Sequence, residues 1–337
     1  MHMLISLPSS WRRVAVTVLT ITGLLLPDAS AQEQAVKPPA PTEKPFLWRF
    51  EVGEATHHLF GTIHLPDPRV TTLSVAVEAA REGADALYVE VLTANKNSLA
   101  LMPKLMLPRG ASLEDILGEK LIEEVRAYCE DAGLPFQAMS RFKPWVLSMN
   151  ISLGEVMKKF QGKDPMDVML EREAREADKV VGELETMEFQ LSLFDKLSEG
   201  YQKQMIQSAL KEAGNGAKTI QKMLDAYLLG DAEALTAVME ESQRKESKEF
   251  AEQFREMMIV SRNKGMAKRI LELLKEHPKR ANFFAVGAAH TFGEDGIVDL
   301  LREQGVKVER LNGAGEVVVE PAPKKPAEEP AEHRKAG

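Results

Sequence analysis

Two short segments, far apart in the sequence, share one pattern: an apolar strand-like run, a glycine, two further residues and a histidine. The first ends in Phe60-Gly61-Thr62-Ile63-His64 and the second in Val286-Gly287-Ala288-Ala289-His290. Open α/β sheets bind ligands beyond the carboxyl ends of their strands. We therefore expect the fold to bring the two strand ends together, so that His64 and His290 share one site. In the alternative interpretation, each glycine only makes a tight strand exit and each histidine is a satisfied loop or core residue.

The N-terminal segment has the pattern of a secretory signal. Arg12 and Arg13 form a positively charged region, residues 14–26 are apolar but short for a membrane span, and Ala29-Ser30-Ala31 is a small-residue cleavage site. We expect residues 1–31 to be removed, with maturation near Gln32, and the protein to be periplasmic or secreted. An uncleaved anchor is the alternative. No later stretch is long and apolar enough to span a bilayer, so no stable membrane insertion is expected after the signal is removed.

The composition limits the classes of function. Cys129 is the single cysteine, so the stability of this exported chain must come from its core and not from disulfides. The formal net charge is −8 and aromatic residues make up 6%, which is atypical of nucleic-acid binding. The acidic balance also disfavours attraction to anionic lipid, so binding to a membrane surface is the weakest class. The composition does not determine the oligomeric state.

Strand-like and helix-like segments alternate along the chain. Residues 32–44 form a Pro- and Ala-rich linker, and residues 316–337 are expected to be a disordered tail. Strands are expected over residues 46–52, 55–60, 86–92, 179–185, 281–286 and 306–311. Helical patterns dominate at about 100–178 and 197–278. We therefore expect an α/β fold over residues 45–315, with a split, mixed or mostly parallel sheet and two large helical insertions.

Two glutamates stand at or near the ends of predicted strands. Glu90 lies in an apolar run, where a carboxylate must be paired, bound to a ligand or placed at the strand end. Glu185 follows another strand and precedes a helix, where it either joins the site or only complements the helix dipole. Asp67 comes soon after the first histidine motif. It either orients a ligand histidine or caps the following turn.

The motifs present restrict the chemistry. The chain has no glycine-rich nucleotide loop, no Cys-x-x-Cys, no His-Glu-x-x-His and no Gly-x-Ser-x-Gly. Two histidines and two or three carboxylates at strand ends remain, and these are ligand types that suit Zn²⁺, Mn²⁺, Co²⁺ or Fe²⁺. A site of two histidines and one glutamate leaves positions open for water, which the metal activates for attack on a carbonyl.

Taken together, the motifs resemble those of the TraB/PrgY/GumN family, whose relatives include the Tiki proteases. The resemblance covers roughly residues 45–315 and is more specific than either histidine motif alone. It rests on Leu59-Phe60-Gly61-Thr62-Ile63-His64, on Tyr88-Val89-Glu90, on Gly182-Glu183-Leu184-Glu185-Thr186 with Gln190, on Arg262-Asn263 with Met266, and on Val286-Gly287-Ala288-Ala289-His290 followed by Gly293 and Gly296.

The resemblance implies a set of functional residues. The family is marked by two Gly-x-x-His motifs, a glutamate and an arginine, which correspond to His64, His290, Glu90 and Arg262. The arginine motif usually has an acidic residue before it, where this chain has Ser261. The Tiki branch implies a metal-dependent protease that favours Mn²⁺ or Co²⁺, whereas the GumN-like bacterial branch has no well-defined reaction.

The expected function is an exported metal-dependent hydrolase, with a peptidase as the type that the resemblance suggests. His64, His290 and Glu90 would bind a divalent metal, with Mn, Co and Zn not distinguished. Glu185 would be a further ligand or the general base, and Arg262 would hold a substrate carboxylate or stabilise an oxyanion. The substrate would be a peptide or a small molecule. The alternative is a non-catalytic envelope or polysaccharide-export accessory protein, in which the same residues form a closed hydrogen-bond network.

Overall fold

The computed structural model of the chain describes residues 40–93, 98–159, 163–213, 216–243 and 247–319. The expected signal segment, most of the linker and most of the C-terminal tail lie outside these ranges. Within them, no helix combines the length and the apolar character that crossing a bilayer requires.

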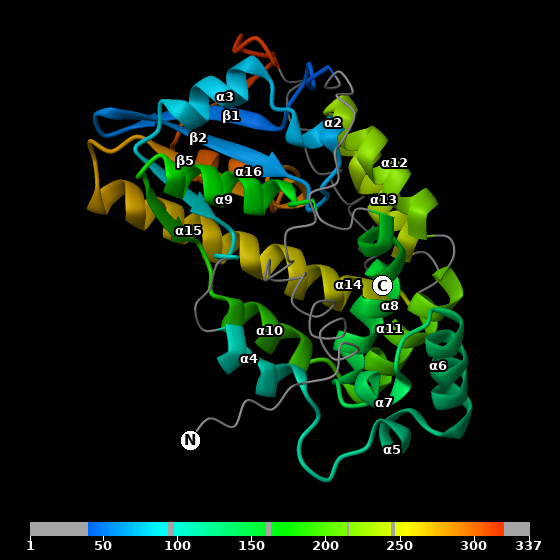
Figure 1. Ribbon diagram of the computed structural model, residues 1–337. Helices are drawn as coiled ribbons and strands as arrows, with labels where there is room; N and C mark the ends of the chain where they lie inside the picture. Colours follow the sequence, from blue (N-terminus) through cyan, green and yellow to red (C-terminus); the bar gives the residue numbers. More distant parts are fainter. Residues whose placement is uncertain (1–39, 94–97, 160–162, 214–215, 244–246, 320–337) are drawn as a thin grey trace, which may run out of the picture.

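A six-stranded mixed sheet lies at the centre of the fold, with the strand order β4-β3-β5-β2-β1-β6 (Figure 1). Neighbouring strands from β4 to β2 pair in parallel, whereas β1 pairs antiparallel with both β2 and β6. The expected α/β fold with a mostly parallel mixed sheet is therefore confirmed. The strands are β1 (Leu47–Val52), β2 (Ala55–Thr62), β3 (Ala86–Val89), β4 (Val180–Glu183), β5 (Asn282–Gly287) and β6 (Val308–Leu311).

A tight turn joins β1 to β2. Val52 pairs with Ala55, so only two residues make the turn, and the first of them, Gly53, has a φ of +69° that favours glycine. A Cβ at Gly53 would also lie 2.5 Å from the carbonyl oxygen of Pro278. The turn fixes the register of β2, whose last residues lead into the first histidine motif.

Helices make up most of the connections. Those between β3 and β4 and between β4 and β5 are the longest. In chain order the helices are α2 (Pro68–Thr71), α3 (Val75–Glu82), α4 (Ser98–Leu105), α5 (Leu113–Leu117), α6 (Glu119–Asp131), α7 (Phe136–Met139), α8 (Pro144–Lys159), α9 (Met166–Glu176), α10 (Met187–Asp195), α11 (Glu199–Glu212), α12 (Gly216–Leu229), α13 (Ala232–Gln243), α14 (Lys248–Arg255), the π-helix η1 (Glu256–Val260), α15 (Ser261–Glu276), the 3-10 turn η2 (Ala288–His290) and α16 (Ile297–Glu303).

The buried apolar side chains form two clusters. The sheet cluster combines the strands with residues of α2, α3, α9, α12, α13, α15 and α16. The helical cluster combines residues of α4 to α8 with residues of α10 and α11. In Figure 1 the sheet occupies one half of the molecule and the helical cluster the other. The continuous segment α14-η1-α15 belongs to both, because Met258 packs on the helical cluster and Met266 is buried in the sheet cluster. A polar site between the two clusters can therefore take side chains from both.

The parallel pairing determines where the functional residues meet. Because β2, β5, β3 and β4 run in the same direction, their carboxyl ends lie at one edge of the sheet. His64, His290, Glu90 and Glu185 each follow one of these ends by one to three residues. This edge is the place where α/β proteins form their ligand sites.

Candidate metal centre

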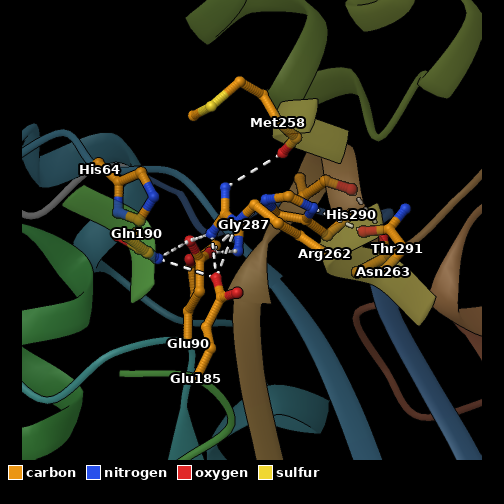
Figure 2. A network of polar contacts seen from close by, with 12 residues as sticks. His64, Glu90, Glu185, Gln190, Met258, Arg262, Asn263, Gly287, His290 and Thr291 are labelled. Carbon is orange, nitrogen blue, oxygen red and sulfur yellow. Dashed lines mark hydrogen bonds and ion pairs between the residues drawn. The ribbon is translucent and has the colours of Figure 1, made fainter. Parts of the chain in front are cut away.

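The glycine of the second motif lies at the centre of the site. A Cβ built on Gly287 would be 3.5 Å from each of three atoms: Oε2 of Glu90, Cδ2 of His290 and Nε2 of His64. The two histidines and the glutamate thus surround a small space that the absence of a side chain leaves open. Figure 2 shows His64 and His290 on opposite sides of Glu90. The fold therefore brings together the two histidines that the sequence places far apart.

His64 is held by a buried carboxylate from α9. Its Nδ1 lies 2.6 Å from Oδ2 of Asp167, whose other oxygen accepts a 2.7 Å hydrogen bond from Thr62 Oγ1. A carboxylate can only accept, so Nδ1 carries the proton and Nε2 is the nitrogen on the side of the Gly287 space. The charge of Asp167 raises the pKa of His64 to about 9. The side chain of His64 is 63% exposed, so the site is open to solvent on this side.

His290 is buried and is held by an amide. Its Nδ1 lies 2.6 Å from Oδ1 of Asn263, and Nδ2 of Asn263 donates to the carbonyl oxygen of Asp295 at 2.7 Å. The second bond fixes the orientation of the amide, so Oδ1 accepts the Nδ1 proton of His290. Burial lowers the pKa of His290 to about 4. His290 is therefore neutral at pH 7, with Nε2 as its free lone pair.

Glu90 lies between the two histidines. Its Oε2 accepts a 3.1 Å hydrogen bond from the backbone N–H of Gly287 and lies 3.8 Å from Nε2 of His290. Burial works to raise its pKa, but the neighbouring His290, Arg262 and His64 hold the pKa of Glu90 well below its usual range. Glu90 is therefore an ionised carboxylate with one oxygen directed at the space beside Gly287.

The second carboxylate, Glu185, shares its partners with Glu90. Arg262 donates from Nε to Oε1 of Glu185 at 2.8 Å, and its Nη2 contacts Oε1 of both glutamates. Gln190 donates from Nε2 to the same two oxygens, at 2.9 Å each. Nη1 of Arg262 donates to the carbonyl oxygen of Met258 in the π-helix at 3.2 Å. Burial raises the pKa of Glu185, although Arg262 and Gln190 act in the opposite direction.

All five residues predicted as ligands or catalytic groups, His64, His290, Glu90, Glu185 and Arg262, lie in this cluster (Figure 2). Arg262 and Asn263 lie in a long charged helix, yet they are 5% and 0% exposed and so do not belong to its solvated face.

Three further residues complete the site. Asn263 and Gln190 belong to the motifs shared with the family, whereas Asp167 belongs to none of the motifs in the sequence. The available signal for Asp167 was its place beside Met166 and Leu170 on the apolar face of a helix. Asp67 caps α2 by accepting a hydrogen bond from the backbone N–H of Arg69.

The donor chemistry fits a divalent metal. Both imidazoles are bound at Nδ1 by an acceptor, which is the arrangement that orients histidine ligands in metal sites. Imidazole and carboxylate are also the ligand types that such metals prefer. In the part of the chain that the structure describes, no group of three or more His, Cys, Asp or Glu side chains is close enough to enclose an ion as it stands. The side chains therefore match a divalent metal in ligand type and in the orientation of both rings. His290 is neutral, whereas His64 would have to lose its Nε2 proton to bind the metal.

The fold and the site define an α/β protein in which two Gly-x-x-His strand ends meet a buried glutamate and arginine. The chain belongs to the TraB/PrgY/gumN family, whose model matches residues 46–310, and the expected membership is thereby confirmed.

Several curated relatives carry the name metalloprotease. The Metalloprotease TIKI homolog of Nematostella vectensis is 27% identical over 314 residues, covering 78% of this chain and 66% of the relative. Metalloprotease TIKI2 of Xenopus tropicalis is 28% identical, covering 83% of this chain and 62% of the relative. Metalloprotease TIKI1 of Homo sapiens is 26% identical, covering 90% and 69%. The chain thus spans about two thirds of the length of these relatives. No solved structure matches it.

Proposed function

We propose that the protein is a metal-dependent peptidase whose metal is held by His64, His290 and Glu90. One observation carries the proposal: the side chains surround the Gly287 space, and both imidazoles have their Nδ1 occupied by an acceptor. Nε2 is therefore the nitrogen that each would offer a metal, with the Nε2 proton that the raised pKa of His64 implies at pH 7 displaced on binding. The metalloprotease names of the relatives favour peptide hydrolysis among the reactions of such a site.

The metal would be divalent, with Mn, Co and Zn equally compatible with these ligands. When bound, it would lower the pKa of a water molecule and polarise a substrate carbonyl. The exposed side of His64 would admit the substrate, since its side chain is 63% exposed while that of His290 is 7% exposed.

Glu185 is the residue that we assign as general base. Among the residues that the structure describes, none donates a hydrogen bond to its Oε2, whereas Oε1 accepts from Arg262 and Gln190. Burial raises the pKa of Glu185, which brings it closer to neutral pH and makes it a better proton acceptor. Arg262 directs its bonds to Glu90, Glu185 and Met258. Its role in the proposal is to compensate the charge of the two carboxylates and hold them in place.

Metal analysis of purified protein tests the proposal. Wild type, His64→Ala and His290→Ala are loaded with Mn²⁺, Co²⁺ or Zn²⁺, and bound metal is measured after desalting. His277→Ala is the matched control, because His277 is exposed at the end of α15. We expect one ion per chain in wild type and in the control and a loss in both site variants. A peptide library analysed by mass spectrometry should show metal-dependent cleavage by wild type and none by the site variants.

The alternative is a non-catalytic module, and one observation favours it. Oε1 of each glutamate already accepts hydrogen bonds from both Arg262 and Gln190. The two carboxylates therefore form a network with protein partners that holds together without a metal. If wild type binds no divalent metal above the level of His64→Ala, and cleaves no peptide, this network is structural and the hydrolase proposal fails.

We also propose that the chain is exported and that its mature part contains the α/β unit of residues 45–315 with its helical insertions, between the linker of residues 32–44 and the tail of residues 316–337. The support is the signal pattern of residues 1–31. N-terminal sequencing of the mature protein should begin near Gln32. An intact N-terminus in the cell fraction would contradict export by cleavage.

A further inference from the structure

The two glutamates of the site are joined through one oxygen each. Oε1 of Glu90 accepts from Gln190 Nε2 at 2.9 Å and from Arg262 Nη2. Oε1 of Glu185 accepts from the same two nitrogens, with Gln190 Nε2 again at 2.9 Å. Each donor is an NH₂ group with two hydrogens, so each can bridge both carboxylates. Figure 2 shows the dashed contacts of both donors converging on the two glutamates.

Because Gln190 and Arg262 bind Oε1 of both glutamates, Oε2 of each carboxylate can act as a metal ligand or as a base. Oε2 of Glu90 faces the N–H of Gly287 and Nε2 of His290. Oε2 of Glu185 accepts no hydrogen bond from any residue in the described ranges. Each carboxylate oxygen has two lone pairs, so Oε2 of Glu90 keeps one beside its bond to Gly287 and Oε2 of Glu185 keeps both. The bonds at Oε1 therefore fix the orientation of each side chain while Oε2 can still bind a ligand or a proton.

Gln190 and Arg262 come from different parts of the molecule. Gln190 lies on α10, whose Met187, Leu191 and Phe194 are buried in the helical cluster. Arg262 lies on α15, whose Met266 is buried in the sheet cluster. The glutamates themselves follow strands of the sheet. Gln190 is thus the residue through which the helical cluster reaches the two carboxylates.

We propose that Gln190 is a positioning residue, which holds Oε1 of Glu90 and Glu185 and so directs their Oε2 atoms toward the site. The inference deepens the proposed function and rests on it. An uncharged amide suits this place, because it satisfies both carboxylates without adding charge. Arg262 supplies the compensating charge, and Gln190 supplies the second direction of hydrogen bonding that stops the carboxylates from rotating.

The test compares three variants of the full chain with wild type. Gln190→Leu removes the donors and keeps most of the volume, whereas Gln190→Glu keeps the shape and replaces the donor by a third carboxylate. Gln202→Leu is the matched control, because in the described part of the chain Gln202 on α11 donates to the carbonyl oxygen of Leu197 and to neither glutamate of the site. Two quantities are measured: the Kd for Co²⁺ from the visible absorption of the bound ion, and the unfolding midpoint in urea of the metal-free protein at pH 7.

We expect Gln190→Leu to bind Co²⁺ roughly tenfold or more weakly than wild type, the usual cost of removing a partner of a ligand, with Gln202→Leu unchanged. In the metal-free protein, Gln190→Glu should unfold at less urea than Gln190→Leu. A residue that only packs would give the reverse order, since Glu has the shape of Gln.

Two results would overturn the inference: Gln190→Leu binding Co²⁺ as wild type does, or Gln190→Glu being at least as stable as Gln190→Leu. If wild type itself binds no Co²⁺, the proposed function fails. The order of the two unfolding midpoints then still shows whether Gln190 holds the two carboxylates.

Discussion

Nδ1 of His64 lies 2.6 Å from Oδ2 of Asp167, although 103 residues separate the two in the sequence. The contact joins the loop after β2 to α9. It also determines the state of the imidazole, since the carboxylate fixes the proton on Nδ1 and raises the pKa of His64 to about 9. The charge of Asp167 is the largest cause of the raised pKa; its hydrogen bond and the charge of Glu90 act in the same direction, whereas burial acts in the opposite one.

Asp167→Asn should therefore lower the pKa of His64 toward 6.5, the ordinary value for histidine. NMR titration of the metal-free protein measures the shift directly. Stability should change with it: between the unfolded pKa of about 6.5 and the folded pKa of about 9, the native state holds a proton that the unfolded state has lost. The stability contributed by this proton is complete below the first pKa and is lost as the pH rises through the second.

The unfolding free energy of wild type should thus fall more between these pH values than that of Asp167→Asn. His290 serves as the internal control, because its partner is the neutral Asn263 and its pKa of about 4 should stay in place. An unchanged His64 titration in Asp167→Asn would contradict the role given to Asp167.

Gly287 offers a way to block the site without disturbing the fold. Its φ of −51° and ψ of 134° suit any residue, and a Cβ would make ordinary contacts of 3.5 Å. Gly287→Ala should therefore stay within about 1 kcal/mol of wild type in its free energy of unfolding. It should bind metal roughly tenfold or more weakly, because the methyl group fills the space between Glu90, His64 and His290. Urea unfolding and a Co²⁺ titration measure the two effects, and unchanged Co²⁺ binding would contradict this role of the space.

Gly61, the glycine of the first motif, should behave in the opposite way. A Cβ there would lie 2.7 Å from Cβ of Phe46 and 3.0 Å from Cα of Ala288, both buried. Gly61→Ala should cost about 1–3 kcal/mol of stability through overpacking. Urea unfolding of Gly61→Ala and Gly287→Ala measures the difference. Equal free energies of unfolding for the two variants would contradict the tight packing assigned to Gly61.

The parts of the fold that the sequence predicts correctly are those set by neighbouring residues in the chain. The helix α3, Val75–Glu82, follows from local signals alone, because an apolar face of regular period ends at Gly83. The strand expected over residues 86–92 ends already at Val89. Beyond it, the backbone N–H of Glu90 still bonds to Ala285, while its side chain turns to the N–H of Gly287. That turn depends on a strand far along the chain, so no local pattern contains it.

The candidate site, too, can be predicted from the sequence only in part. The meeting of His64 and His290 follows from two strand ends and parallel pairing, which the sequence indicates. The partners of the histidines do not follow in this way. Asp167 resembles an ordinary acidic residue in the first turn of a helix, and its function comes only from its contact with His64. The π-helix Glu256–Val260, which brings the Met258 carbonyl to Arg262, departs from the period of 3.6 on which helix prediction relies.

Arg262 is the residue whose loss should cost the most stability. Its side chain is 6% exposed, and the side chains of its partners Glu185 and Glu90 are 7% and 13% exposed. Arg262→Met leaves two buried carboxylates without their cation, and removing one partner of a buried ion pair costs about 3–5 kcal/mol. The matched control is Arg269→Met, also on α15, whose partners Glu272 and Glu276 are half exposed and whose loss should cost at most about 1 kcal/mol.

The loss in Arg262→Met should depend on pH in a definite direction. Burial already raises the pKa of Glu185, and without Arg262 it rises further, so the native state binds a proton more readily than the unfolded state does. The stability of Arg262→Met relative to wild type should therefore improve as the pH falls from about 7 to about 5. Urea unfolding of wild type, Arg262→Met and Arg269→Met at both pH values measures this. A deficit in Arg262→Met that is no larger than in Arg269→Met, or that grows in acid, would show that Arg262 does not compensate the two carboxylates.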